Sequence, residues 1–390
     1  MLESNIDDLD KNLIKDKIVK NIYGFELLFV PYIISHTILT RFLKENGIIL
    51  KGKERLGVYL TNTLDIEDNE EPPMYKVLFN LKKEYDKAMD IKGKDILAII
   101  GNPPYLNGKS PCISKKIDEE LEKYKQDLNE QKHNLNDLYV KFIRFAELKI
   151  EKQKQGVIGI ITNNGYLDGI TFRQMRKHLY ETFDEIYILN LHGNTCECET
   201  DKNIFDIQVG VAIAIFVKLP KKTNKKVIKY FSTMDNKFIE RDEKLNFLDN
   251  TKFKNVKWKT LKPVESYYWF VDKDFSWEAE YKKFLNLTKI FDLYGSGASA
   301  LKDKVCIPYN KKDLITILDY FKNHNEQQIQ NKYQLEDSRD WKVSYAKQDV
   351  ELNYKDSDNF IRKILYRPFD VRDTFYSETS SGFLQYRKKK

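Results

Sequence analysis

Apolar runs alternate with amphipathic segments in the part of the chain before residue 220. The runs 95–100 (Asp-Ile-Leu-Ala-Ile-Ile) and 156–162 (Gly-Val-Ile-Gly-Ile-Ile-Thr) show no apolar–polar alternation, which is typical of strands buried on both faces of a parallel sheet. Further strands are expected at 21–26, 55–60, 185–191 and 208–217, the last being the final long apolar strand. Helices are expected at 13–20, 27–44, 117–154 (amphipathic over 138–150) and 172–182. Strands that alternate with helices predict a doubly wound α/β sheet.

The character of the chain changes after Lys218. Residues 220–226 form a basic linker, and beyond them aromatic side chains crowd a lysine-rich background without clear periodicity. We therefore place a domain boundary near residue 220, which gives domains 1–220 and 221–390, and expect mixed α/β structure in the second. The aromatic residues within 252–283 fit either a core or base stacking beside phosphate contacts, and we favour the core. They include Trp258, Tyr267, Tyr268, Trp269, Phe270, Phe275 and Trp277.

Composition bounds the class of protein. The 390 residues exceed the usual size of one domain, and 41% hydrophobic residues suffice for a sizeable core. No run of about 18 apolar residues occurs and no apolar stretch lies near the start, so we expect neither a membrane span nor a secretory signal. Four cysteines make no disulfide framework at this length, which favours the cytoplasm. The net charge of +7 permits a nucleic-acid partner, although an AT-rich genome would also give many lysines.

The segment Asn102-Pro103-Pro104-Tyr105 follows the strand expected at 95–100 and carries the candidate chemistry. The amino group of adenine is a poor nucleophile, because its lone pair is delocalised into the ring. The side-chain carbonyl of Asn102 and the backbone carbonyl of Pro103 can accept its two hydrogens, and two prolines hold that loop stiff. Tyr105 offers a ring on which a base rotated out of the duplex can stack. This pattern predicts methyl transfer to a planar amine.

Two alternatives bear on that segment. Asn and Pro are also common in turns that end strands, although four specified residues directly after a buried strand make a plain turn the weaker interpretation. The segment by itself does not fix the substrate, because an RNA base or a protein glutamine presents a similar planar amide or amine.

Two polar residues mark a candidate nucleoside site. Glu26 ends a short strand before a helix, where related folds place an acid on a ribose hydroxyl; a carboxylate favoured at a helix start is the alternative. Asn62 follows the next strand and can contact the adenine ring of a cofactor, although Asn is equally common as a cap or in a turn. A glycine-rich loop, which lets the backbone approach such a ligand, is expected before Glu26, but no glycine precedes Tyr23.

A metal site is not expected. His192, Cys196 and Cys198 form an H-x3-C-x-C cluster, but structural zinc needs four ligands and the next cysteine, Cys306, is remote in sequence.

With these residues in view, the chain resembles the methyltransferase and target-recognition portion of type ISP restriction-modification enzymes, from about Ile22 to Tyr386. Residues 22–28 with Pro31, Tyr32 and His36 resemble the second cofactor motif of the family, and residues 59–64 resemble its third. Residues 366–372 (Tyr-Arg-Pro-Phe-Asp-Val-Arg) resemble a motif of its specificity region. Segments 137–144, 156–168, 191–194 and 203–211 resemble those that follow the catalytic loop.

The resemblance implies an S-adenosylmethionine-dependent methyltransferase sheet and a C-terminal target-recognition domain. It implies S-adenosylmethionine as methyl donor and adenine in double-stranded DNA as acceptor. Asn102, Pro103, Pro104 and Tyr105 match the catalytic motif. Glu26 matches the ribose-binding acid and Asn62 the adenine contact, and Asn102 also borders the cofactor. Arg367 and Arg372 are candidates for DNA contacts, with ion pairs to Asp370 and Asp373 as the alternative.

The departure from the family pattern is large, because the glycine-rich first motif, the nuclease and the motor are absent from this sequence. We therefore expect either a truncated gene product or the downstream half of a split enzyme whose upstream polypeptide supplies them. In both cases an N-terminally truncated methyltransferase sheet is expected here. The leading hypothesis is an adenine-specific DNA methyltransferase of a restriction-modification system. The alternatives are a DNA-specificity fragment without catalysis and a methyltransferase acting on RNA or protein.

Overall fold

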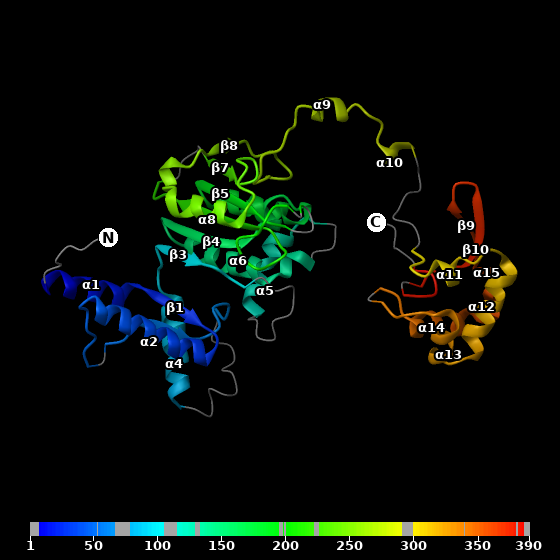
Figure 1. Cartoon of the computed structure of the whole chain (residues 1–390), viewed down its shortest axis with the longest axis horizontal. Helices are drawn as coiled ribbons and strands as arrows, with labels where there is room; N and C mark the ends of the chain where they lie inside the picture. Colours follow the sequence, from blue (N-terminus) through cyan, green and yellow to red (C-terminus); the bar gives the residue numbers. More distant parts are fainter. Residues whose placement is uncertain are drawn as a thin grey trace. The chain divides into compact units, whose positions relative to one another are not determined.

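The computed structural model describes residues 8–52, 54–66, 79–104, 115–128, 133–194, 198, 200–221, 226–290, 299–338, 340–379 and 381–385. Its contacts divide the chain into two compact units, Met1–Asp274 and Phe275–Lys390, which are described separately. Figure 1 labels their elements. The domain boundary that the sequence predicts near residue 220 differs from the boundary between these compact units, and it stays a prediction about function.

A six-stranded mixed sheet forms the centre of the first unit, in the order β3-β4-β6-β5-β7-β8 (Figure 1). β6 runs antiparallel to both of its neighbours, whereas β3–β4 and β5–β7 are parallel pairs. The strands are β3 (Ala98–Gly101), β4 (Gly156–Asn163), β5 (Glu185–His192), β6 (Val211–Lys218), β7 (Val227–Ser232) and β8 (Lys259–Leu261). The expected α/β sheet is confirmed, and its central part is mixed.

The strand predicted at 208–217 as the last long apolar strand is not the last strand of the sheet. β7 pairs with β5 along six residues and β8 pairs with β7, so the sheet continues beyond the basic linker. Lys226 precedes β7 and Lys229 interrupts its apolar run. The strand was therefore not recognised from the sequence. The Nζ of Lys226 donates to the backbone carbonyls of Tyr180 and Glu181 at 2.6 Å, so this lysine serves a structural contact at the strand's start.

Helices cover the two faces of this sheet. On one face α5 (Lys115–Lys125), α6 (Leu138–Glu151) and α7 (Arg173–Thr182) pack on Ile158, Ile188 and Phe216 in the largest core cluster. On the other face Phe247 of α8 (Arg241–Asn250) stacks on Phe231 of β7, with ring centroids 5.0 Å apart. Short 3-10 turns link these elements: η1 (His133–Asn136), η2 (Asn164–Leu167), η3 (Ile170–Phe172) and η4 (Phe253–Asn255).

A buried ionic cluster joins the helices of the first face. Glu147, which is fully buried, accepts hydrogen bonds from the Tyr124 hydroxyl and from Arg144, both at 2.6 Å, and lies 2.7 Å from Nδ1 of His178. Burial opposes the charge of Glu147, but the hydrogen bond to His178 and the Arg144 cation outweigh it and lower the pKa of the carboxyl. Because these four residues come from α5, α6 and α7, the cluster fixes the helices against one another.

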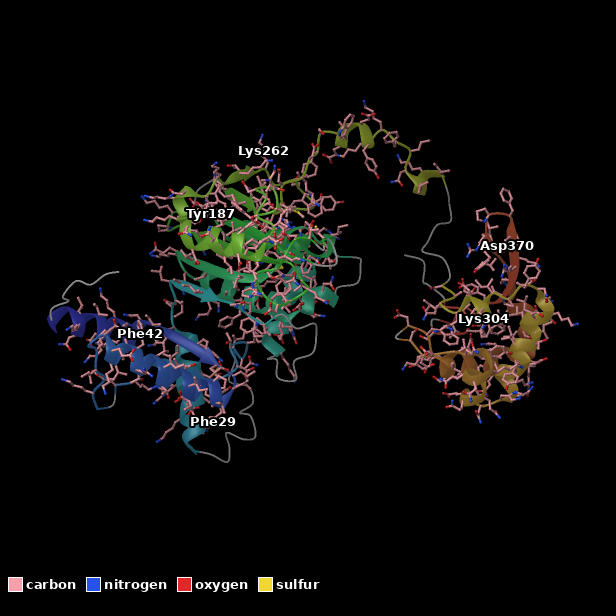
Figure 2. The ribbon with its side chains drawn as sticks, in the orientation of Figure 1. Phe29, Phe42, Tyr187, Lys262, Lys304 and Asp370 are labelled. Atoms are coloured by element: carbon pink, nitrogen blue, oxygen red, sulfur yellow. The ribbon has the colours of Figure 1, made fainter. Side chains whose placement is uncertain are left out.

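A second, two-stranded parallel sheet precedes the large one, made of β1 (Tyr23–Glu26) and β2 (Gly57–Leu60). Around it lie α1 (Asp8–Asn21), α2 (Phe29–Glu45) and α4 (Phe79–Gly93), with Phe29 and Phe42 near the two ends of α2 (Figure 2). Phe25 of β1 packs against the cluster that contains Leu138 and Phe145 of α6. The helix α6 therefore supports both sheets of this unit.

The second unit is mixed α/β, as expected for its region. An antiparallel hairpin of β9 (Ile361–Arg367) and β10 (Asp370–Phe375) packs with helices around Phe321, Trp341 and Phe383. Asn310 caps α12 by accepting from the backbone N–H of Asp313 at 2.9 Å, as N-cap asparagines do. The helical segments are α9 (Glu278–Tyr281), α10 (Leu287–Ile290), α11 (Asp303–Cys306), α12 (Lys311–Asn323), α13 (Glu326–Tyr333), α14 (Val343–Asn353), η5 (Tyr354–Asp356) and α15 (Ser357–Phe360).

Candidate active site at the carboxyl edge of the sheet

Asn102 directly follows β3, at the carboxyl edge of the large sheet. Because β3 and β4 are parallel, with Gly101 opposite Ile160, the residues after β3 lie beside the last residues of β4. Asn102 and Pro104 are exposed and Pro103 is buried. The predicted role of Asn102 and Pro103 as acceptors for an amine stays a prediction. Tyr105, the fourth predicted residue, lies outside the described residues.

Glu26 ends β1, and its carboxylate is partly engaged. Its Oε1 accepts a hydrogen bond from the backbone N–H of Leu28 at 2.8 Å, at the start of α2. The helix-start contact that we gave as the alternative is therefore present. The second carboxylate oxygen is not required for that contact, and the ribose-binding role of Glu26 stays a prediction.

Asn62 lies next to Glu26 in the small sheet. Glu26 is opposite Leu60 in the β1–β2 register, and the backbone N–H of Thr61 donates to the carbonyl of Glu26 at 2.8 Å. The side-chain Oδ1 of Asn62 accepts from the backbone N–H of Leu64 at 3.1 Å, which makes a local turn. The structure thus brings together the two predicted cofactor residues that follow β1 and β2.

Lys92, at the end of α4, was missed by the sequence analysis. Its Nζ donates to Oγ1 of Thr61 at 2.8 Å and to the backbone carbonyls of Asn62 at 2.6 Å and Asp65 at 2.8 Å. Burial lowers the pKa of Lys92 to about 8, against the opposing effect of the Asp65 charge. Three oxygen acceptors around one buried ammonium hold the turn that carries Asn62. A single lysine in a lysine-rich helix gives no sequence signal for this role.

A polar network lies at the carboxyl ends of β4, β5 and β7. Asn164 donates to Oδ1 of Asn190 at 3.1 Å, and Asn190 donates to the Tyr230 hydroxyl at 3.2 Å. Nε2 of His192 lies 2.9 Å from the Ser232 hydroxyl, and burial lowers the pKa of this imidazole. These side chains brace the strand ends, and the sequence analysis assigned them no individual role.

The loop that follows β5 is fixed by a buried ion pair. Lys244 donates to Asp201 at 2.7 Å, and the side chains are 0% and 2% exposed. The other oxygen of Asp201 accepts from the backbone N–H of Gly193, whose φ of +84° favours glycine. Among the described residues no group of three His, Cys, Asp or Glu is arranged to hold a metal, and Cys196 lies outside them.

Arg372 forms the ion pair that we gave as the alternative to DNA contact. Its Nη2 lies 2.8 Å from the Asp370 carboxylate, and its guanidinium is 4.4 Å from the centre of the Tyr366 ring. Asp373 instead pairs with Lys363 at 2.9 Å. Arg367 ends β9, with its guanidinium 5.2 Å from the same Tyr366 ring. The DNA-binding roles of both arginines stay predictions.

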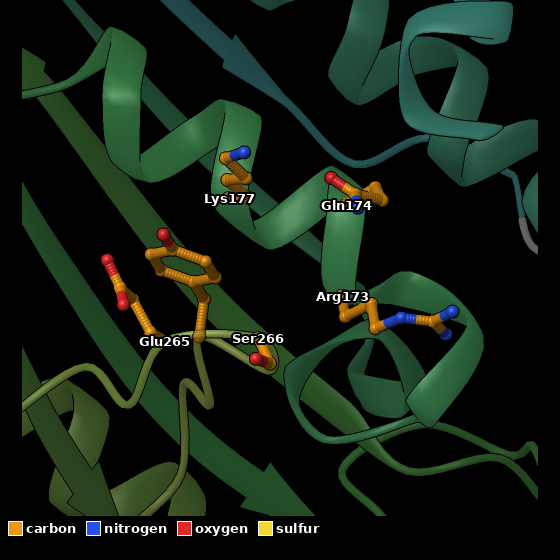
Figure 3. A pocket seen from close by; sticks show the side chains of 6 residues that line it. Arg173, Gln174, Lys177, Glu265 and Ser266 are labelled. Atoms are coloured by element: carbon orange, nitrogen blue, oxygen red, sulfur yellow. The ribbon is translucent and has the colours of Figure 1, made fainter. Parts of the chain in front are cut away.

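Two cavities lie away from the predicted residues. One, of about 260 Å³, is bounded by α7 and the segment 265–268, and Figure 3 shows the Arg173 guanidinium directed away from Glu265. The other, of about 170 Å³, is apolar and lies between β5–β6 and Phe253 and Trp258. Neither is lined by Glu26, Asn62 or Asn102.

Two family models match the two parts of the chain. Residues 20–196 match the model described as Eco57I restriction-modification methylase. Residues 289–389 match the Type ISP C-terminal specificity domain. The fold and the family matches thus define a restriction-modification methylase region followed by a specificity region. The resemblance to type ISP restriction-modification enzymes found in the sequence is thereby confirmed.

Solved structures share the fold. The cryo-EM structure of a DrdV–DNA complex has 24% identity and a TM-score of 0.65, over 94% of this chain and 38% of that one. A nuclease-deletion mutant of the Type ISP enzyme LlaGI with a DNA substrate mimic has 21% identity and a TM-score of 0.63, over 94% and 37%. The ATP-dependent Type ISP enzyme LlaBIII bound to DNA has 22% identity and a TM-score of 0.62, over 95% and 26%.

This chain therefore spans well under half the length of each of these three proteins. No match was found among curated proteins. Within the part of the chain that the structure describes, no helix combines the length and apolar character needed to cross a membrane.

Proposed function

We propose that the chain carries the methyl-transferring and target-recognising parts of a DNA adenine methyltransferase of a restriction-modification system. The observation that carries this proposal is the position of Asn102-Pro103-Pro104 directly after a parallel strand, beside β4. Ligands of open α/β sheets bind outside the carboxyl ends of the strands, and Glu26 and Asn62 also follow such ends. The catalytic candidate Asn102 and the cofactor candidates Glu26 and Asn62 thus all lie at the carboxyl ends of parallel strands.

Asn102 and Pro103 act on the amine. The Asn102 side-chain carbonyl and the Pro103 backbone carbonyl accept the two amine hydrogens of a flipped adenine, which raises the electron density on nitrogen. The fixed φ of two prolines holds both acceptors in place before the base arrives. Tyr105 supplies the stacking face. After transfer the extra proton leaves to water, since no general base is needed for a positively charged amine.

The residues near β1 and β2 fit a nucleoside cofactor. A carboxylate oxygen of Glu26 that the Leu28 contact does not use can accept a ribose hydroxyl, and the Asn62 amide has donors for a ring nitrogen. Lys92 holds the Asn62 turn rigid. When bound, S-adenosylmethionine supplies the methyl group. On the DNA side we propose contacts from Arg367 and Arg372 in the C-terminal recognition domain.

Several apolar side chains near the site are uncovered, which supports a further polypeptide as partner. Ile100 of β3 is 92% exposed and Leu97 is 61% exposed, although strands of this type are normally buried. Among the described residues β3 pairs only with β4, and β1 only with β2. On α2, one stripe at four-residue spacing is also exposed: Val30 63%, Ile34 49%, Ile38 60% and Phe42 60%.

We infer that an upstream polypeptide supplies a parallel strand, a glycine-rich cofactor loop and a covering helix, and the nuclease and motor with them. Co-expression with the region encoded directly upstream tests this. Amide exchange of residues 98–101 should slow in the resulting assembly, and unchanged exchange there would contradict the inference.

Methyl transfer is the direct test. Tritiated S-adenosylmethionine is incubated with the chain, with its upstream partner present, and plasmid DNA, RNA or protein. We expect label in adenine of DNA, and Asn102→Ala should abolish it while DNA binding persists; Asn250→Ala, an exposed asparagine on α8, is the matched control. Equal loss of methylation and DNA binding in Asn102→Ala would overturn the proposal, and label in RNA or protein would redirect it.

A non-catalytic specificity fragment is the second candidate, favoured by the match of residues 289–389 to a C-terminal specificity domain. Calorimetric titration of the chain and of its assembly with S-adenosylmethionine separates the two. Saturable binding supports the enzyme. Absence of binding in both, together with sequence-specific DNA binding, supports the fragment.

A further inference from the structure

Two aromatic side chains form a flat stack in the segment between β8 and the end of the first unit. The rings of Tyr267 and Trp269 have centroids 4.9 Å apart and an interplanar angle of 5°. Nζ of Lys273 lies 4.3 Å from the centre of the Trp269 ring, and the Arg176 guanidinium lies 4.8 Å from it. Tyr267 is 41% exposed. The Tyr267–Trp269 stack is therefore an aromatic surface with cations beside it.

A buried cation fixes this stack to the loop after β4. Arg176 is fully buried, and its Nη1 donates to the backbone carbonyls of Tyr166 and Gly169, both at 2.8 Å. Its Nε lies 2.9 Å from the carbonyl of Tyr267 and 3.1 Å from that of Tyr268. Burial lowers the pKa of Arg176 to about 9, so the side chain remains charged at pH 7. One guanidinium thus joins two segments that are about 100 residues apart in sequence.

The backbone beneath the stack is strained. Ser266 and Tyr268 have φ values of +79° and +50°, in a region that costs about 1–3 kcal/mol per non-glycine residue. Such conformations persist only where surrounding contacts enforce them, and they concentrate at binding sites. Here the carbonyls of Tyr267 and Tyr268 are held by Arg176, and Phe270 donates its backbone N–H to Leu167 at 3.0 Å. The arrangement keeps the Tyr267 ring at the surface.

The stack is joined to the edge that carries the candidate active site. Tyr166 and Gly169 follow the carboxyl end of β4, and β4 is the parallel neighbour of β3, which ends at Asn102. Lys273 lies 3.5 Å from Asp168 in the same loop. A nucleic acid bound at that edge would therefore have this surface within reach of its flanking nucleotides.

We propose that the exposed side of the Tyr267 ring stacks on an unpaired base of bound DNA, with the Lys273 ammonium beside the adjoining Trp269 ring. Exposed aromatic rings beside cations are the usual platforms for unpaired bases, and stacking tolerates any base because each has a π face. Our expectation that the aromatic residues of 252–283 form a core holds for Phe270, which is 0% exposed, but not for Tyr267. The inference rests on DNA as the proposed substrate.

Fluorescence anisotropy with two labelled duplexes tests it. The duplexes share one sequence, and one of them carries a central bulged adenine. We expect the wild-type chain to prefer the bulged duplex and Tyr267→Ala to lose that preference, with binding to it weakened about five- to 150-fold. Tyr267→Phe should retain it, because the ring face is unchanged.

Phe253→Ala is the matched control, since Phe253 is 50% exposed and contacts Tyr187 near the opposite end of β5. This control should bind as the wild type does. An equal loss of preference for the bulged duplex in Phe253→Ala, or an unchanged preference in Tyr267→Ala, would overturn the stacking proposal. Either result would leave the proposed function standing. Absence of binding to either duplex at low salt would instead contradict the proposed function itself.

Discussion

The buried ammonium of Lys92 donates a hydrogen bond of 2.6 Å to the backbone carbonyl of Asn62. The same nitrogen holds Thr61 and Asp65, so one side chain from α4 sets the conformation of the turn after β2. Asn62 was predicted to contact a nucleoside from its place after a strand. In the structure the Lys92 ammonium fixes the backbone of Asn62, and Lys92 can be substituted without changing Asn62 itself.

Lys92→Met should destabilise the first unit by about 1–3 kcal/mol, because buried carbonyls lose their donor. It should also weaken S-adenosylmethionine binding, since the Asn62 turn is released. Urea unfolding and calorimetric titration measure the two effects. Lys87→Met is the control, because Lys87 is exposed on the same helix. Equally weakened S-adenosylmethionine binding in both variants would show that Lys92 does not specifically position the Asn62 turn.

The pKa of Lys92 also predicts a pH dependence. Its folded value of about 8 lies below the ordinary 10.5, so between these values the unfolded chain binds more protons than the folded chain. The free energy of unfolding therefore rises with pH across this window, by up to about 3 kcal/mol from this group. The difference in unfolding free energy between wild type and Lys92→Met should grow from pH 8 to pH 10.5. A constant difference would contradict the burial of a charged lysine.

Glu147→Gln should cost about 3–5 kcal/mol of unfolding free energy, because Arg144 loses its fully buried partner and keeps only the partly exposed Glu120 and Glu151. The side chains of Arg144 and Glu147 are both 0% exposed. Glu151→Gln is the matched control, since Glu151 contacts the same Arg144 at 3.1 Å but is 37% exposed. That pair should contribute at most about 1 kcal/mol. Similar losses in the two variants, measured by urea unfolding, would argue against the buried cluster.

Arg367→Ala should weaken DNA binding more than Arg372→Ala. Arg372 already uses its guanidinium on Asp370, whereas Arg367 lies over the Tyr366 ring at the end of β9. A lost phosphate contact should reduce the slope of log affinity against log salt by about 1. Arg362→Ala, on the same strand, is the control. If all three variants keep the wild-type slope, neither candidate arginine contacts phosphate.

Ile100→Ser should change the stability of the isolated chain by no more than about 0.5 kcal/mol, because the side chain is 92% exposed. Ile160→Ser, in the neighbouring strand, removes a side chain that is 4% exposed and should cost several kcal/mol, on the order of 2–5. In an assembly with the proposed upstream polypeptide, Ile100→Ser should become destabilising. Thermal unfolding of both forms makes the comparison, and insensitivity of the assembly would mean that nothing covers Ile100.

The fold and the candidate site were predictable from the sequence where short-range patterns carry them. The apolar run at 156–162 gave β4, and strand-ending positions gave Glu26, Asn62 and Asn102. The contacts of Lys92, Arg176 and Lys244 were not predictable, because each lysine or arginine binds backbone or carboxylate groups distant in sequence. β7 was missed because Lys229 breaks its apolar run. The Asp370–Arg372 pair was foreseen as an alternative because a single residue separates its partners in the sequence.

The open edge of β3 has a practical consequence for work with this chain. Among the described residues β3 pairs only with β4, so its other edge, beside the exposed Ile100, is a template to which an extended segment can add, including the same edge of a second copy. Oligomers formed in this way would grow with protein concentration and would hide the surface that a true partner needs. The apparent affinity and the activity per molecule of the isolated chain are therefore expected to fall as its concentration rises.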